Sequence, residues 1–166
     1  MRVLGIDPSS QATGYGIIEF EQSRYRVLAY GSIKPPRRSG LAEKLRLIKT
    51  GVDLLIEKHD PAEVAIENPF YAQNIKTALT LGQVRGAVLV SVAGRGRPLF
   101  EYSPLEIKKA VTGYGRAEKS QVATMIRALL EIADEEIEED ASDALACAFC
   151  HINTRLYQKN IEDSKA

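Results

Sequence analysis

The stretch Arg2-Val3-Leu4-Gly5-Ile6-Asp7-Pro8 decides the fold prediction, because it joins a short apolar run to an acidic residue and a proline. An apolar run of this length that ends at a turn is typical of a buried strand in an α/β sheet. An aspartate directly after such a strand lies at the sheet edge where open α/β sheets bind their ligands. The chain therefore opens with a predicted core strand and a candidate site residue, Asp7.

The rest of the chain predicts strands and helices arranged around this first strand. Two more strands are expected at 14–20 and 25–33, joined by a polar turn, and a helix with apolar residues at helical spacing then stops at Asp60-Pro61. The apolar run 64–66 suits a central strand. A further strand is expected at 98–102, and helices at about 77–93, 104–111, 117–132 and 140–157. This order predicts an α/β fold, a mixed central sheet flanked by helices on both faces.

Length and composition indicate one domain. The chain has 166 residues, of which 45% are hydrophobic, enough to bury a proper core. We expect residues 1–158 to form this domain and 159–166 to be a frayed tail. The chain enters its first strand without a signal peptide, and we expect no apolar stretch to reach the ~20 residues of a membrane span, so we expect a cytoplasmic protein.

Charge is distributed unevenly along the chain. The whole sequence carries 22 basic and 22 acidic residues, but residues 1–127 carry a net +7 and residues 128–166 a net −7. The acidic excess is concentrated in residues 134–140, which, except for Asp140, we interpret as a solvated loop and helix start. A basic face for nucleic acid is therefore compatible with the formal charge of zero.

Four acidic residues fall where such a fold would gather them. Asp7 and Glu67 follow strands expected to be parallel neighbours, and Asp140 and Asp143 lie three apart on one face of the last helix. Each alone has an ordinary explanation as a turn, surface or helix N-terminal residue. Together they would repel one another unless a divalent cation neutralised them, so they favour a Mg²⁺ or Mn²⁺ site, with room for two ions ~4 Å apart, that acts on phosphates.

Two other patterns have a structural and a functional interpretation. The helix at 77–93 carries Ala78, Gly82 and Gly86 at four-residue steps, which predicts a close backbone approach, either to the sheet or to a second subunit. The segment from Cys147 through Cys150 to His151 has the C-x-x-C-H spacing of haem attachment. Because it lies in an apolar helical pattern, we expect no haem and no zinc, and interpret both cysteines as core residues.

Seven short motifs together resemble RuvC, the family of bacterial Holliday junction resolvases, over roughly residues 2–155. In chain order they are Gly5-Ile6-Asp7-Pro8, Thr13-Gly14-Tyr15-Gly16, Ala65-Ile66-Glu67, Leu81-Gly82-Gln83-Val84-Arg85-Gly86, Phe100-Glu101-Tyr102, Ala117-Glu118-Lys119-Ser120-Gln121-Val122 and Asp140-Ala141-Ser142-Asp143-Ala144-Leu145-Ala146. No single motif is specific, but their order along the whole domain is. Ser9 stands where the family commonly has glycine, so the resemblance does not define the backbone conformation of that turn.

The resemblance implies an RNase H-like fold, a homodimer and a Mg²⁺-dependent crossover junction endodeoxyribonuclease of DNA recombination and repair. It implies symmetric paired nicks in a four-way junction, made by two-metal-ion hydrolysis that leaves 5′-phosphate and 3′-hydroxyl ends. The family's four acids match Asp7, Glu67, Asp140 and Asp143, of which Asp140 is the most replaceable, since some relatives carry histidine there. It also implies RuvA and RuvB as partners.

Several residues are candidates for DNA contact. Phe70 matches the family's junction-probing aromatic, and Tyr71 follows it in the same loop. Lys119 matches a family lysine near the scissile phosphate, where a cation stabilises developing negative charge. Phosphate contacts are expected from cations around the glycine-containing loop that follows residue 111, namely Lys108, Lys109 and Arg116, and are left open for the loop cations Lys34, Arg37 and Arg38.

Two other classes of protein remain as alternatives. A nucleotide-dependent switch of the actin and sugar-kinase type also begins with a strand that ends in aspartate before a glycine-containing turn, but it binds nucleotide between two domains, and this chain predicts one. A catalytically silent junction-binding scaffold would keep the basic residues and Phe70 but would have no need of four acids.

Overall fold

The computed structural model describes residues 1–68, 74–133 and 137–164. These residues form a five-stranded sheet in the order β3-β2-β1-β4-β5, in which β1 pairs antiparallel with β2 and parallel with β4. The pair β2–β3 is antiparallel and the pair β4–β5 is parallel. The strands are β1 (Arg2–Asp7), β2 (Thr13–Glu21), β3 (Arg24–Ile33), β4 (Glu63–Glu67) and β5 (Leu99–Tyr102). The predicted mixed sheet is confirmed.

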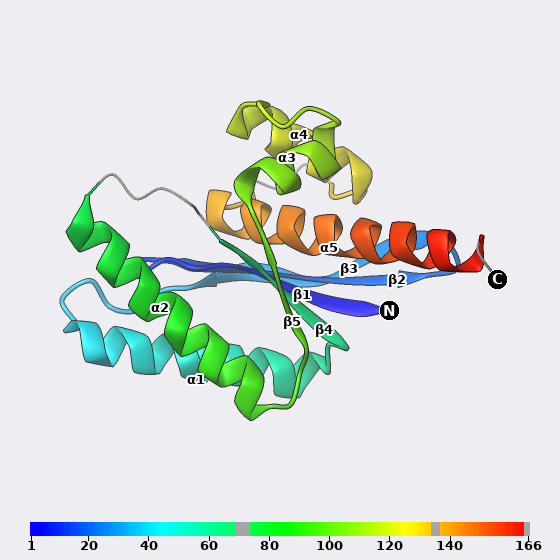
Figure 1. Ribbon diagram of the computed structural model, residues 1–166. Coiled ribbons are helices and arrows are strands. Elements are labelled where there is room, and N and C mark those ends of the chain that lie inside the picture. Colours follow the sequence, from blue (N-terminus) through cyan, green and yellow to red (C-terminus); the bar gives the residue numbers. More distant parts are fainter. Residues whose placement is uncertain (69–73, 134–136, 165–166) are drawn as a thin grey trace.

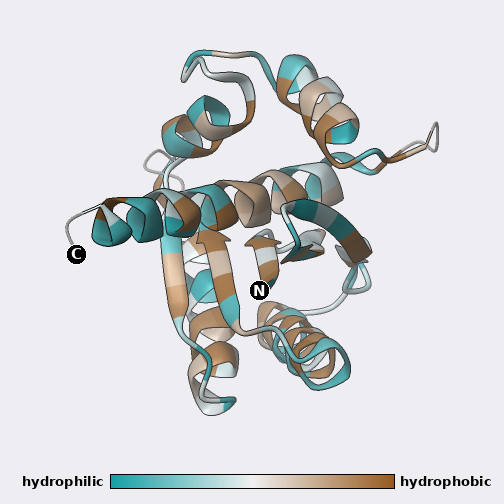
Figure 2. Ribbon diagram, turned by 90° about the vertical axis from the view of Figure 1, so that its right-hand side faces the viewer, coloured by the Kyte–Doolittle hydropathy of each residue, from teal (hydrophilic) through white to brown (hydrophobic). Residues whose placement is uncertain are grey.

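Helices cover both faces of this sheet (Figure 1). One face carries α1 (Leu41–His59) and α2 (Ile75–Gly94), and the other carries α5 (Glu139–Asp163), with α3 (Pro104–Thr112) and α4 (Lys119–Leu129) stacked beyond it. Figure 2 shows the strands between these two layers, with hydrophobic residues along the middle of α5. The core accordingly has two parts, one between the sheet and α5 and one between the sheet and the α1–α2 layer.

Helix α5 lies unusually close to the sheet because glycines face it. A Cβ added at Gly5 would lie 2.1 Å from the carbonyl oxygen of Ala144, and one added at Gly14 would lie 1.9 Å from that of Asp140. At Gly16 it would lie 2.7 Å from the Leu145 side chain. Each position excludes any larger residue, so these three glycines set the height of α5 above β1 and β2.

The helix boundaries lie within three residues of those predicted, except at the end of α5, and α4 is shorter than the expected 117–132. At α3 the predicted capping box is present, with Ser103 at the N-cap and Glu106 at N3. Helix α1 ends at Asp60, whose φ of 47° is left-handed and whose N–H donates to the Ile56 carbonyl oxygen. Helix α5 continues to Asp163, six residues beyond the expected end at Tyr157. The domain boundary at 158 stays a prediction.

Helix α2 departs from the sequence expectation. It is 20 residues long and, by length and composition alone, apolar enough to cross a membrane. The fold buries only 22% of the most apolar part of the helix, so most of that part is not covered by the described residues. A Cβ added at Gly82 or Gly86 would meet no atom of the described residues within 4 Å. The close approach predicted at these glycines is therefore not made to the sheet within the described residues.

Candidate active site

The four acids are brought to one edge of the sheet by β1, β4 and α5. Ile6 and Ile66 are register partners in the parallel pair β1–β4, so Asp7 and Glu67 follow them at adjacent carboxyl ends. Asp140 and Asp143 lie on the first turns of α5. The arrangement expected from the sequence, two strand ends faced by one helix start, is the one the structure has.

A close backbone contact holds the start of α5 over Asp7. Gly14 is the register partner of Asp7 in the pair β1–β2, and the carbonyl oxygen of Asp140 rests against the space where a Gly14 side chain would be. The turn between the strands is closed by Thr13, whose Oγ1 donates to the carbonyl oxygen of Ser9 at 2.6 Å. Ser9 is not among the residues with positive φ, so this turn does not need glycine there.

The electrostatics of the four carboxyls reflect burial and mutual repulsion. Burial, then repulsion from Glu67, Asp143 and Asp140, raises the pKa of Asp7 to about 8. Burial followed by repulsion from Asp143 raises the pKa of Glu67 to about 7. The pKa values of Asp140 and Asp143 are also raised, in both cases chiefly by burial. Repulsion from other acids therefore adds to burial at each of the four carboxyls.

Lys119 is the cation of this group. Its Nζ donates to Glu139 Oε1 at 2.8 Å and to Asp143 Oδ2 at 3.2 Å. The hydrogen bond to Glu139 is the main cause of its raised pKa, so the ammonium group stays charged. A cavity of about 210 Å³ opens beside it, lined by Glu67, Lys108 and Asp143, with Pro104, Ile107, Lys119 and Val122 completing the wall.

The donor set of the site fits a hard divalent cation. All four candidate ligands are carboxylates, and oxygen ligands suit Mg²⁺ and Mn²⁺. Repulsion among them is what a bound cation would relieve. Across residues 1–68, 74–133 and 137–164, no three acidic, histidine or cysteine side chains stand at ligating distance of a common point. The four carboxylates thus lie at the same edge of the sheet, but no three of them are close enough to one point to ligate a single ion there.

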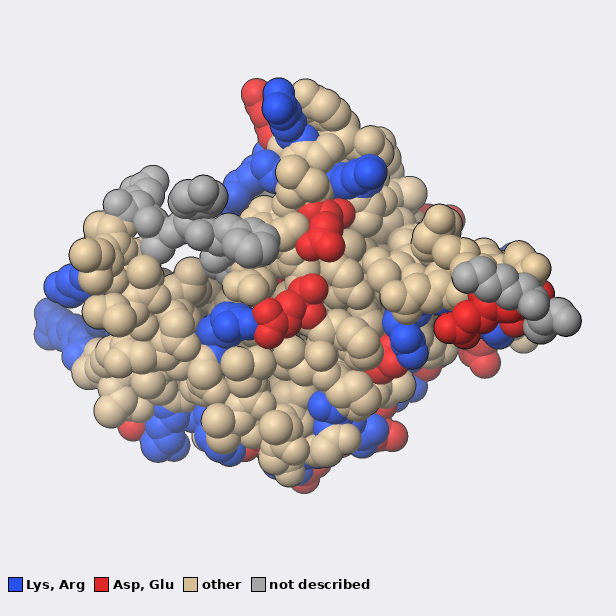
Figure 3. Space-filling view, in the orientation of Figure 1, with Lys and Arg blue, Asp and Glu red and all other residues tan. Residues whose placement is uncertain are grey.

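The other predicted DNA-facing residues are placed unevenly. Lys108 lines the cavity beside Glu67, whereas Lys109 and Arg116 are exposed and do not line it. Figure 3 shows basic side chains gathered over the lobe formed by α3 and α4. Phe70 and Tyr71 lie outside the described residues.

Sequence reasoning missed two contributors. Glu139 belongs to the acidic run expected to be solvated, but it is the nearer partner of Lys119. Gly14 was noted only as part of a motif, although it sets the position of Asp140. A lysine and a glutamate 20 residues apart carry no local signal of pairing, whereas a glycine within a predicted strand is a usable sign of close approach.

The C-x-x-C-H segment belongs to the core. Cys147 and Cys150 are free and buried, as expected, and His151 is fully buried beside them. Its Nδ1 lies 2.7 Å from the Tyr102 hydroxyl and its Nε2 lies 2.7 Å from Glu63 Oε2. Both ring nitrogens are thereby used in a structural network, and neither points to a ligand.

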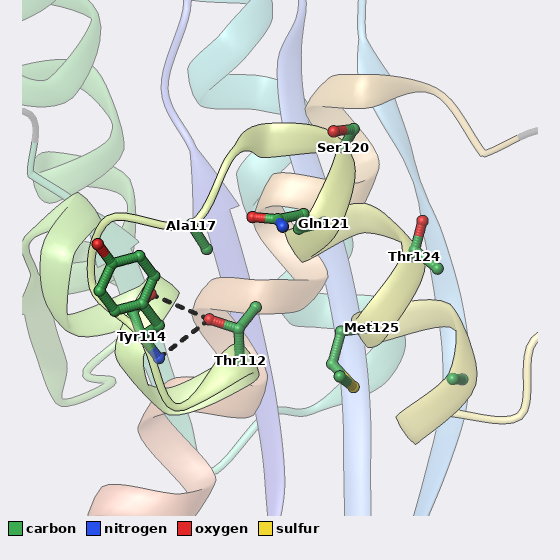
Figure 4. A pocket seen from close by; sticks show the side chains of 8 residues that line it. Thr112, Tyr114, Ala117, Ser120, Gln121, Thr124 and Met125 are labelled. Atoms are coloured by element: carbon green, nitrogen blue, oxygen red, sulfur yellow. Dashed lines mark hydrogen bonds between the residues drawn. The ribbon is translucent and has the colours of Figure 1, made fainter.

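A separate hollow of about 560 Å³ lies between α3 and α4 (Figure 4). Tyr114, Ala117 and Met125 line it, and Thr112 Oγ1 donates to the carbonyl oxygen of Tyr114 and accepts from its N–H. None of the four acids lines this hollow. The acidic edge, rather than the larger hollow, is the candidate active site.

An acidic centre at the strand ends of this mixed sheet, facing a helix that carries two more carboxylates, defines the nucleases of RNase H-like fold. The sequence profile described as "Crossover junction endodeoxyribonuclease RuvC" matches residues 3–151. The chain belongs to this RuvC family, a family of metal-dependent nucleases.

Two curated relatives and one solved structure illustrate the similarity. The RuvC of Clostridioides difficile is 37% identical over 163 residues, covering 98% of this chain and 96% of that protein. The RuvC of Halorhodospira halophila is 47% identical over 154 residues, covering 93% and 91%. Thermus thermophilus RuvC, solved in complex with a Holliday junction substrate, superposes with a TM-score of 0.87 at 30% identity, covering 94% of this chain and 96% of that one. These matches confirm the RNase H-like fold and the nuclease class, and they favour neither the nucleotide switch nor the silent scaffold.

Proposed function

We propose that the protein resolves four-way DNA junctions by cutting two opposed strands symmetrically, with Mg²⁺ held by Asp7, Glu67, Asp140 and Asp143. The observation that carries this proposal is that the ends of β1 and β4 and the start of α5 bring these carboxylates to one edge of the sheet, where they repel one another. Membership of the RuvC family supports the junction as substrate. The same membership supports RuvA and RuvB as partners, and action on DNA supports the cytoplasm as the site of action.

The protein's own residues then have separate tasks. Asp7 and Glu67 would bind metal from the sheet, and Asp140 and Asp143 from α5. A pair of divalent ions, when bound, would supply an activated water and stabilise the leaving oxygen in an in-line displacement, which leaves 5′-phosphate and 3′-hydroxyl ends. Lys119, charged and adjacent to Asp143, would donate to a non-bridging phosphate oxygen as negative charge develops there.

The test uses a labelled synthetic four-way junction and a linear duplex of the same sequence, each with Mg²⁺ or EDTA. We expect Mg²⁺-dependent paired nicks on the junction alone. Asp7→Asn should abolish cutting while junction binding survives, because the substitution removes a metal ligand and leaves the basic surface intact. The matched control is Asp53→Asn on α1, outside the acidic edge, which should cut normally. Tight binding without cutting under any divalent metal would contradict the proposal.

A homodimer through α2 completes the proposal, because a junction has two equivalent strands to cut and two copies present one site to each. Ile75, Leu79 and Val90 are 80%, 65% and 63% exposed, and they lie on one stripe of the helix with Gly82 and Gly86. Figure 3 shows little charge over the part of α2 that faces the viewer. Large exposed apolar residues beside uncovered glycines favour close helix–helix contact between copies.

A further inference from the structure

A basic hollow lies at the same sheet edge as the acids, on the other side of them from Lys108. It has a volume of about 590 Å³ and is lined by Lys34, Arg37 and Lys44, with Gln11, Ala12 and Pro35. These residues come from the loop after β1, the segment after β3 and the first turns of α1. Strands β1 and β3 run in the same direction, because each is antiparallel to β2, so both end at the edge that carries Asp7.

The wall of this hollow is tied to the helix that carries two of the acids. Lys34 Nζ pairs with Glu138 Oε1, and Ser32 Oγ donates to Glu138 Oε2 at 2.7 Å. Glu138 is the N-cap residue of α5, two positions before Asp140. The wall of the hollow is therefore linked through Glu138 to the start of α5, which carries two of the acids.

Arg37 and Lys44 have no anionic partner of their own. Elsewhere on the surface, cations are commonly paired, as are Arg46 with Glu43 and Lys49 with Asp53 on the same helix α1. Within the described part of the chain, no ion pair engages Arg37 or Lys44. Lys34 is paired with Glu138, so Arg37 and Lys44 supply the uncompensated positive charge of the hollow, and this charge attracts an anion.

The order of the sheet relates this hollow to the cations on the other side of the acids. Lys108 follows β5, the outermost strand on one side of the sheet, and the hollow follows β3, the outermost strand on the other side. The carboxyl ends of β1 and β4, which carry Asp7 and Glu67, lie between them. Strand β3 stands two places from β1, which is roughly 10 Å at ~4.8 Å per strand. That separation corresponds to about three nucleotides of one DNA strand at ~3.4 Å of axis each.

We propose that the hollow lined by Arg37 and Lys44 binds a backbone phosphate of the strand being cut, a few nucleotides from the scissile bond. This inference rests on the proposed function and adds a second anchoring point to it. With phosphates held on both sides of the acids, the scissile phosphate is positioned between them, which is how non-catalytic cations fix register on DNA without reading sequence.

The experiment compares Arg37→Gln/Lys44→Gln with Arg24→Gln/Lys58→Gln, both in an Asp7→Asn background that cannot cut. Arg24 and Lys58 are exposed cations at the opposite end of the sheet, so the control removes the same charge from a surface that does not face the acids. Fluorescence anisotropy with a labelled four-way junction gives the affinity over a range of salt concentrations in EDTA.

We expect the first pair of substitutions to reduce the slope of log affinity against log salt by about 1 to 2, since each duplex phosphate contact contributes about 0.9. Affinity near 100 mM salt should fall on the order of tenfold. The control pair should leave the slope unchanged, and Arg37→Lys/Lys44→Arg, which keeps both charges, should retain the wild-type slope. Equal slopes for the two glutamine pairs would overturn the proposal.

Two further readouts separate the possible failures. Loss of junction cutting by the wild-type protein would overturn the proposed function, whereas an unchanged slope in a protein that still cuts would overturn only the phosphate site. NMR titration with inorganic phosphate tests a free anion as the occupant. Saturable shifts at Arg37 together with an unchanged slope for the junction would assign the hollow to a free anion and overturn the proposal.

Discussion

The charged form of Asp7 destabilises the metal-free fold. Its folded-state pKa of about 8 lies far above the ordinary value of 3.8, so folding disfavours the charged carboxylate. The resulting destabilisation is absent below pH 4, where the carboxyl is protonated in both states, and grows as pH rises from 4 to 8. Asp7 therefore does not stabilise the fold by its charge, which is consistent with the proposed role as a metal ligand.

Asp7→Asn should make the metal-free protein more stable at pH 8, because it removes this buried charge. A shift of about four pKa units sets an upper bound of roughly 5 kcal/mol, and relaxation of the coupled carboxyls reduces the gain to the order of 2 kcal/mol. Urea denaturation in EDTA at pH 5 and pH 8 measures it, and the gain should be smaller at pH 5. An Asn variant no more stable than wild type at pH 8 would contradict the assignment of Asp7 to a repulsive acidic cluster.

Asp53 supplies the opposite case on the same protein. Burial acts to raise its pKa, but hydrogen bonds from Lys49 and Ser91 leave the pKa below its ordinary value. Asp53→Asn should therefore lower stability at pH 8, by about 1 kcal/mol. The pKa of Asp53 is lowered because its carboxylate is hydrogen-bonded, whereas the pKa of Asp7 is raised because it is buried beside like charges. The expected effects of the two Asn substitutions on stability therefore have opposite signs.

At the scale of single residues, the sequence predicted where the four acids lie in the fold, but not which side chains contact them. Asp7 and Glu67 follow recognisable strands, and Asp140 and Asp143 share a helix face, so local pattern was sufficient for them. The Lys119–Glu139 pair joins two helices through the tertiary fold, and no periodicity in the chain encodes it. Contacts of this kind become visible only once the elements are placed.

The elements themselves follow from local chemistry, whereas their separations do not. Periodicity predicted the strands and helices because each buries one face, and the capping box at Ser103 marked the start of α3. The closeness of α5 to the sheet depends on Gly5, Gly14 and Gly16, three positions that a strand pattern treats only as weak points. Packing distance is thus the part of the fold that sequence reasoning missed.

Gly14→Ala tests this packing distance. The added Cβ would lie 1.9 Å from a backbone oxygen that no side-chain rotation can move, so α5 must shift away from β2. We expect a loss of stability of ~3 kcal/mol or more, and loss of junction cutting, because Asp140 moves with the helix. Thermal and urea unfolding, together with the cutting assay, measure both effects.

Gly94→Ala at the end of α2 is the matched control for that substitution. Nothing lies within 4 Å of its added Cβ among the described residues, so the protein should cut normally and be up to ~1 kcal/mol more stable. A Gly14→Ala variant that behaves like this control would show that α5 is not held by the glycine contact.

The β2–β3 hairpin contains a correctable strain. Gln22 and Ser23 form its two-residue turn with φ values of 49° and 61°, a conformation that favours glycine. Ser23→Gly should therefore raise the free energy of unfolding by about 0.5 kcal/mol. Ser39→Gly, in a loop without positive φ, should lower it slightly, because there glycine only adds freedom to the unfolded chain. Urea unfolding of both variants decides whether the turn is strained.

On the scale of the whole molecule, α2 is the element whose composition does not match its surroundings within one chain. The helix has the length and composition of a membrane span, and a Cβ added at Gly82 or Gly86 would meet no atom of the described residues within 4 Å. The proposed second copy of the chain would cover this helix, and it would present a second active site to a symmetric junction.

Leu79→Asp/Val90→Asp should separate the subunits without touching the acids. Each substitution puts a charge into the proposed interface, where desolvation is costly, so light scattering should report a monomer. Each monomer keeps a complete acidic edge and should still nick, but its two cuts would no longer be coupled by shared binding. On a supercoiled plasmid that extrudes a cruciform, the wild type should give mainly linear product and the variant mainly nicked circles.

Leu54→Asp is the matched control, since Leu54 is a comparably exposed leucine, 59% accessible, on the neighbouring helix α1. It should remain a dimer and give linear product. If the α2 double variant also stays dimeric, the interface lies elsewhere and the exposed stripe has another partner. If it becomes monomeric and still linearises the plasmid in one binding event, coupling of the two cuts does not depend on the dimer. Dimer geometry and paired cutting are therefore tested separately by the same two variants.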